Sequence, residues 1–79
     1  MRAYTYRELA ESLIRAYRED IAKLRHQLEP LEAGAMRMGE SRAGGPWVDV
    51  TAKQIQLLKD GIQQYEISIA DLEAQLADA

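Results

Sequence analysis

The sequence predicts an all-α protein: an antiparallel two-helix hairpin with a coiled-coil-like seam, which two copies complete as a four-helix bundle. Two apolar stripes recur at alternating steps of three and four residues, over residues 10–38 and 55–76. This spacing places each stripe along one face of an α-helix. The charges beside the two stripes match in sign only when the chain folds back on itself.

The chain is short, and this bounds what it can build. Seventy-nine residues are expected to form one domain, residues 1–79. A chain of this length has a small core to offset its conformational entropy. It contains no cysteine, so no disulfide can add stability. A partner chain, most simply a second copy, is the expected supplement.

The first helix is expected over residues 5–38. Thr5 and Glu8 have the spacing of a capping box, in which each side chain binds the other residue's backbone amide. Pro30 predicts a kink or brief break near residue 29, because proline lacks an amide proton and crowds the preceding turn. The stripe continues in phase to Met38, and Gly39 is then the expected C-cap.

The second helix is expected over residues 51–78. Thr51 and Gln54 repeat the capping-box spacing at its start. Residues 39–50, GESRAGGPWVDV, are expected to form the connection, with its flexible point at Gly44-Gly45-Pro46. This segment shows no strand-like alternation of useful length.

One register satisfies both the apolar seam and the flanking charges. It places Arg18 beside Glu73, Arg25 beside Glu66, and Glu32 beside Lys59, and a slip of one heptad creates like-charge pairs instead. On the other flank it places Gly34 beside Gly61, where the backbones either approach closely or Gly34 merely loosens the kink. The apolar layers of this register are Met38/Ile55, Ala35/Leu58, Leu31/Ile62, Leu28/Tyr65, Leu24/Ile69, Ile21/Leu72 and Tyr17/Leu76.

The sequence offers no set of residues typical of catalysis or metal binding. His26 is the only histidine and falls on the solvent side of its helix. Zinc sites need three or four ligands drawn largely from cysteine and histidine. The carboxylates lie at outward positions, and no Glu-x-x-His motif of a di-metal bundle occurs. We therefore expect no enzyme activity, no cofactor and no metal.

The charge distribution argues against a nucleic-acid partner. Residues 1–45 hold eight Lys/Arg and seven Asp/Glu, whereas residues 46–79 hold two and six. A nucleic-acid-binding protein usually shows a basic face. No apolar run approaches the length of a membrane span, and no signal core opens the chain. The expectation is a cytoplasmic protein, with binding of nucleic acid through the arginines of the first helix as an alternative.

Apolar residues outside the seam predict self-association. Leu9, Leu13 and Ala16 form a second stripe beside the first, and Leu57 and Gly61 lie on the same flank of the second helix. A lone hairpin would leave these residues in water. A homodimer that forms a four-helix bundle would cover them.

The connection is longer than a helix–helix link needs, and it is the expected partner site. Trp47, the only tryptophan, has two interpretations: a plug that packs on the open end of the hairpin, or an exposed anchor for a partner. The plug is the favoured interpretation. Arg37, Arg42 and Asp49 are then expected to point outward as contact residues.

The closing segment Ile69-Ala70-Asp71-Leu72-Glu73-Ala74-Gln75-Leu76 is similar to the last helix of the small head-to-tail joining proteins of tailed phages. Those proteins also pair two helices, and they carry a short β-hairpin between them. Residues 39–50 do not predict that hairpin, so the family is not assigned. The expected function is a non-enzymatic adaptor that binds an unknown protein partner. A phage-type structural or inhibitory accessory protein is an alternative.

Overall fold

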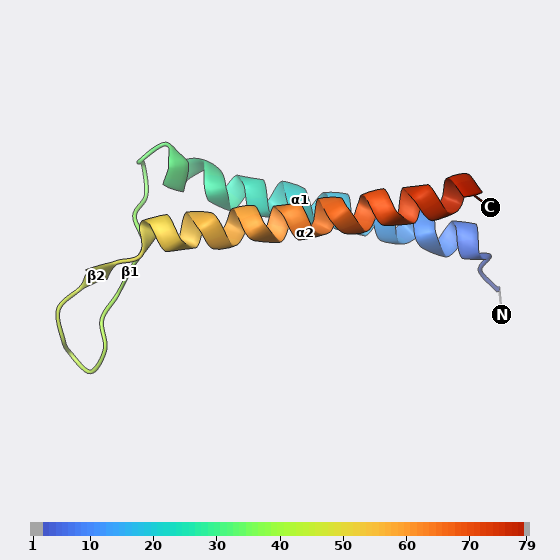
Figure 1. The fold of residues 1–79 in the computed structure, drawn as a ribbon. Coiled ribbons are helices and arrows are strands. Elements are labelled where there is room, and N and C mark those ends of the chain that lie inside the picture. The colour runs from blue at the N-terminus through green and yellow to red at the C-terminus, as the bar shows by residue number, and fades with distance from the viewer. Residues whose placement is uncertain (1–2, 79) are drawn as a thin grey trace.

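Two long helices packed side by side make up most of the protein. In the computed structural model, which describes residues 3–78, α1 spans Tyr6–Glu32 and α2 spans Thr51–Asp78. Between them lie two short antiparallel strands, β1 (Gly39–Glu40) and β2 (Val48–Asp49). The two helices run in opposite directions, so both ends of the chain lie at one end of the molecule (Figure 1). The molecule is elongated, measuring 55 × 28 × 17 Å.

The core is the seam between α1 and α2, as the apolar stripes predict. It contains one cluster of buried side chains with Tyr17, Leu24, Ile55, Tyr65, Leu72 and Leu76 packed against it. The rings of Tyr17 and Tyr65 lie 5.4 Å apart. The charge of Asp20 raises the pKa of Tyr65 at the edge of the seam. The buried cluster consists of Ile14, Ile21, Leu28, Leu31, Leu58, Ile62 and Ile69.

The three predicted ion pairs form along one flank of the seam, but the predicted apolar layers are offset. Tyr17 contacts Tyr65 rather than facing Leu76, and Leu24 lies beside Gly61 rather than facing Ile69. Arg18 lies 3.3 Å from Glu73, and Arg25 lies 3.2 Å from Glu66. Lys59 lies 3.2 Å from Glu32. Because these side chains are about half exposed or more, each pair adds little stability. Together they select this register over slipped alternatives.

Hydrogen bonds also join the start of α1 to the end of α2, which the apolar stripes do not predict. The Thr5–Glu8 capping box forms as predicted. The hydroxyl of Tyr6 donates to Gln75 of α2. Arg7 donates to the carbonyl oxygen of Leu76 at 3.2 Å, so it satisfies a free carbonyl in the last turn of α2. The start of α1 is therefore tied to the end of α2.

The predicted extension of the first helix to Met38 is wrong, because α1 ends at Glu32. Pro30 lies within its last turn. The amides of Gly34 and Ala35 donate to the carbonyl oxygens of Leu31 and Pro30, at 3.3 and 2.9 Å. These two bonds, with Gly34 at φ +75°, form a Schellman C-cap.

This C-cap changes three further expectations. Gly34, rather than Gly39, supplies the left-handed residue that terminates the helix. A Cβ built on Gly34 would meet nothing within 4 Å, so Gly34 makes no close approach to Gly61. The layers Met38/Ile55 and Ala35/Leu58 do not form as helical layers, because the helix has ended before residue 35.

The second helix has the predicted bounds, but the predicted capping box at its start is wrong. The Thr51 hydroxyl binds Asp49 and Met38, as described below, and not the amide of Gln54. That amide donates instead to the carbonyl oxygen of Val50 at 2.9 Å. Met38 and Asp49 take the place of Gln54 at the Thr51 hydroxyl, because the connection folds into strands that bring residues 38 and 49 to Thr51.

The ion-pair register gives a first testable prediction. Glu66→Arg should destabilise the protein modestly by opposing Arg25, and adding Arg25→Glu should recover part of the loss. The coupling free energy in a double-mutant cycle should be about 0.5 kcal/mol, measured by urea unfolding.

Arg15 offers a matched control, because it makes no ion pair within residues 3–78. Combining Arg15→Glu with Glu66→Arg should recover nothing. Equal recovery from Arg15 and Arg25 would show that net charge, and not the pair, is responsible.

Candidate functional site

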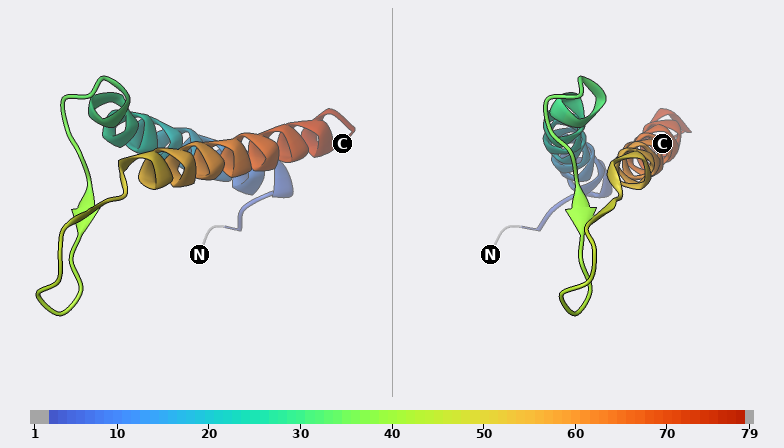
Figure 2. Two further views of the ribbon diagram at one scale, coloured as in Figure 1. Left: turned by 60° about the vertical axis from the view of Figure 1, so that its left-hand side comes forward. Right: turned by 90° about the vertical axis from the view of Figure 1, so that its left-hand side faces the viewer.

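The β-hairpin formed by β1, β2 and their connecting turn is the most distinctive feature of the surface. It extends from the start of α2 away from both helices, at the end of the molecule opposite the chain termini (Figures 1 and 2). The expectation of a connection without strands is therefore wrong. Gly39 pairs with Asp49, and Glu40 pairs with Val48.

A tight turn at residues 42–45 closes the hairpin. The amide of Gly45 donates to the carbonyl oxygen of Arg42 at 2.8 Å. The central residues, Ala43 and Gly44, have φ values of +50° and +75°. Positive φ at both positions defines a type I′ turn, whose twist matches that of paired antiparallel strands. The Ser41 hydroxyl also donates to the Gly45 carbonyl oxygen, at 2.5 Å.

Trp47 lies across the hairpin on Gly39. A Cβ built on Gly39 would stand 1.7 Å from the indole ring, so only glycine leaves room for it. The two residues are diagonal neighbours of the strand pair, a position within reach of an aromatic side chain. Trp47 nevertheless remains 58% exposed. The plug interpretation is wrong, because the ring rests on the hairpin itself and its other side meets solvent.

Asp49 forms the base of the hairpin together with Thr51. One carboxylate oxygen accepts from the Thr51 amide at 2.9 Å and from the Thr51 hydroxyl at 2.6 Å. The other accepts from Arg37, whose Nε lies 3.0 Å away and whose terminal nitrogen is also within ion-pair distance. Arg37 and Asp49 are both exposed, as expected, but their side chains bind each other.

These bonds lower the pKa of Asp49 to about 2, from its ordinary 3.8. The hydrogen bonds from the Thr51 side chain and backbone are the largest causes, followed by those from Arg37. All of them favour the ionised carboxylate.

The opposite face of the hairpin presents Val48, which is 53% exposed. Successive residues of a strand point to opposite faces, so Trp47 and Val48 give the hairpin an apolar side chain on each. Val48 also lines a shallow hollow with Arg42, which is exposed as predicted. Met36 and Met38, just before β1, are 48% and 37% exposed. Sequence reasoning missed Val48 and Gly39, because strands of two residues are too short to show an alternation of apolar and polar side chains.

The residues predicted to form the self-association surface are exposed on the two helices. Leu9 is 53%, Leu13 37% and Leu57 56% exposed. Ala16 is also exposed. Gly61 is half-buried, and a Cβ built on it would stand 3.3 Å from Leu24. Leu9 and Leu13 lie near the chain termini, whereas Leu57 lies near the hairpin, so the structure places them at opposite ends.

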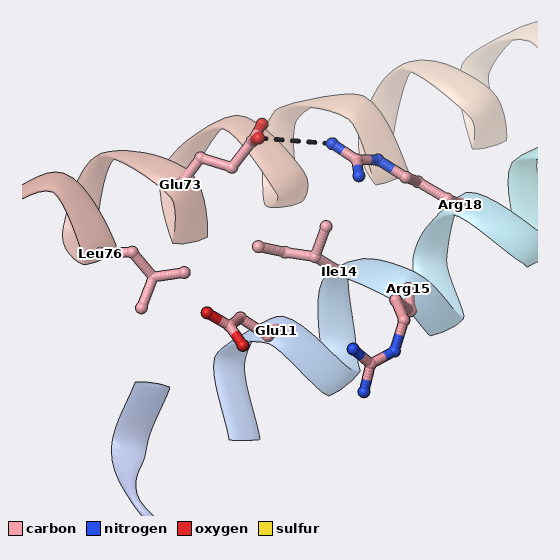
Figure 3. A pocket seen from close by; sticks show the side chains of 6 residues that line it. All are labelled: Glu11, Ile14, Arg15, Arg18, Glu73 and Leu76. Carbon is pink, nitrogen blue, oxygen red and sulfur yellow. Dashed lines mark hydrogen bonds and ion pairs between the residues drawn. The ribbon is translucent and has the colours of Figure 1, made fainter. Parts of the chain in front are cut away.

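A hollow near the ends of the two helices is lined by apolar and charged side chains (Figure 3). Ile14 and Leu76 supply apolar walls. Glu73 forms its ion pair with Arg18 across the hollow, and Glu11 lies 3.8 Å from Arg7. Both carboxylates are thus neutralised by arginines at the surface, and within residues 3–78 no polar or charged side chain is buried.

Many charged side chains of the described residues lie in separate ion pairs at the surface. Within residues 3–78 no group of three or more metal-ligating side chains comes together. Arg7, Arg18, Arg25 and Arg37 all pair with carboxylates, which cancels much of the basic field. No described helix is long and apolar enough to cross a membrane.

Comparisons with protein families, with curated proteins and with solved structures found no match to the chain.

The lowered pKa of Asp49 predicts a local response to acid. A carboxyl whose pKa is lower in the folded state stabilises that state fully above its ordinary pKa of 3.8. This contribution is lost as the pH falls through about 2. The hairpin base should therefore loosen between about pH 4 and pH 2.

Carbon-13 NMR of the Asp49 carboxyl group should give a midpoint near 2. Arg37→Gln should raise this midpoint only part of the way, because the larger contributions come from Thr51. A midpoint at the ordinary value in the unmodified protein would contradict the described base.

Proposed function

We propose that the protein is a non-enzymatic protein–protein interaction protein, an adaptor that presents the β-hairpin to a protein partner. The observation that carries this proposal is the contact and exposure of the Trp47 side chain. Its indole is held against Gly39, yet 58% of the residue is exposed.

An exposed but ordered tryptophan suits a binding role. Tryptophan is enriched among the few residues that dominate interface energetics. Because the ring already rests on Gly39, less conformational entropy is lost when a partner covers it. Val48 adds an apolar contact on the second face, and the paired helices supply a rigid support.

Trp47→Ala should abolish capture of the partner that the wild-type protein retains from a lysate of its source. Gly39→Ala should do the same while keeping the tryptophan, because the added methyl group must displace the indole. Bound proteins would be identified by mass spectrometry. Helix content should stay unchanged, as measured by circular dichroism.

Ile67→Ala is the matched control, because Ile67 is 54% exposed but lies on α2. It should retain the partner. Retention by Trp47→Ala with loss by Ile67→Ala would place the contact on the helices and not on the hairpin.

The second part of the proposal is a homodimer that forms a four-helix bundle. Leu9, Leu13 and Ala16 occupy one end of a face, and Leu57 with Gly61 the other. A two-fold axis across the helices would bring each patch onto the other patch of the second copy, a closed arrangement that covers both. One hairpin alone has a small apolar core. Burying further apolar surface between two copies would add to its stability.

Leu13→Glu should weaken this dimer by placing a charge in an apolar interface. The melting temperature of the wild-type protein should rise with protein concentration, and that of Leu13→Glu should rise less. Ile67→Glu makes the same change outside the proposed face and should leave the dependence intact. Sedimentation of the wild type as a monomer at all concentrations would rule out the dimer.

A second candidate function is assembly in the manner of the head-to-tail joining proteins of tailed phages. The pairing of β1 with β2 favours it, because such proteins carry a short β-hairpin between two helices, and the sequence alone did not predict this element. A tagged copy should then remain with phage particles through density-gradient purification from an induced source culture. Recovery only as free protein would go against this candidate.

A further inference from the structure

We propose that Asp49 is an orientation lock, which fixes the β-hairpin at one angle to α2 and can be released without unfolding the helix pair. This inference deepens the proposed function and rests on it in one respect: the locked orientation is the one that a partner meets. It concerns the conformation of the chain and needs no partner to be examined.

The lock connects both strands of the hairpin to the first residue of α2. Asp49, at the end of β2, accepts from the amide and the hydroxyl of Thr51 at 2.9 and 2.6 Å. The same hydroxyl accepts from the Met38 amide at 2.9 Å, just before β1. The Val50 amide donates to the Met38 carbonyl oxygen, also at 2.9 Å. Asp49 and Thr51 therefore close a ring of bonds around the point where the hairpin leaves the helix.

Arg37 extends the lock to the segment that leads out of α1. Its guanidinium binds the carboxylate oxygen that Thr51 leaves free. The Asp49 side chain is 33% exposed, whereas that of Arg37 is 71% exposed. The carboxylate is thus the central and more enclosed partner, and Arg37 covers it from outside.

The hairpin owes its order to these polar bonds and not to the apolar core. The core cluster contains only residues of α1 and α2. Residues 39–49 are all exposed, and the hairpin stands away from the helices in two views (Figure 2). A segment with few buried apolar contacts opens at a lower free energy than the core that supports it. Breaking the lock should therefore free the hairpin and leave the seam intact.

The test compares Asp49→Asn with Glu40→Gln by NMR of the full chain. Both substitutions remove one carboxylate from the hairpin, but within residues 3–78 the Glu40 side chain makes no hydrogen bond or ion pair. Residual dipolar couplings of the hairpin amides, compared with those of α2, provide the readout, because they report the orientation of the two elements relative to each other. Hydrogen exchange at the Val50 amide provides a second readout.

In Asp49→Asn we expect the hairpin couplings to shrink toward zero while those of α2 are kept, and Val50 exchange to accelerate severalfold. Helical circular dichroism should keep its amplitude. In Glu40→Gln all three measurements should match the wild type. Unchanged couplings with unchanged exchange in Asp49→Asn would overturn the lock, and loss of helix together with the hairpin couplings would overturn its independence from the seam.

The lock and the proposed function can fail separately. If wild type captures no partner while Asp49→Asn still releases the hairpin, the lock stands and the interaction role does not. If Asp49→Asn changes neither NMR readout while Trp47→Ala abolishes capture, the interaction role stands and the lock is wrong.

Discussion

The apolar seam between α1 and α2 is the interaction on which the rest of the structure depends. It buries the only large cluster found within residues 3–78, and that cluster holds no polar side chain. Ion pairs at its flank contribute little free energy, yet they discourage slipped registers with similar apolar contacts. Stability and register are thus supplied by different residues of the same surface.

The reversal of the chain lies outside this seam, because α1 ends early. The Schellman cap at Gly34 satisfies the last carbonyl groups of α1 within the chain itself. Residues 36–50 are then free of the helical repeat and can pair as strands. Because these residues contribute nothing to the core cluster, their side chains can be exposed without weakening the helix pair.

The helices and the ion pairs at their flank could be predicted because they follow from periodicity and from charges at fixed spacing. The facing of the apolar layers could not, because the two stripes pack with similar contacts when they are offset along the seam. The hairpin could not, because two-residue strands are too short to show alternation and Gly44 signals only a turn. Thr51 illustrates a second limit. Its spacing to Gln54 is that of a capping box, but Asp49 and Met38 compete for its hydroxyl once the strands form. Gly34 was visible in the sequence, yet its role depends on a φ of +75° that the pattern does not encode.

Trp47 shows how two interpretations of one residue can each contain part of the physical explanation. The plug interpretation assumed that a lone tryptophan near a helix end would fill space; the anchor interpretation assumed that it would be exposed. The indole uses one side to cover Gly39 and leaves the other side to solvent. The contact with Gly39 orders the ring, and exposure keeps it accessible, so the same geometry provides both requirements of a preorganised contact residue. The cost is an apolar surface in water, which the protein confines to a small element held by polar bonds.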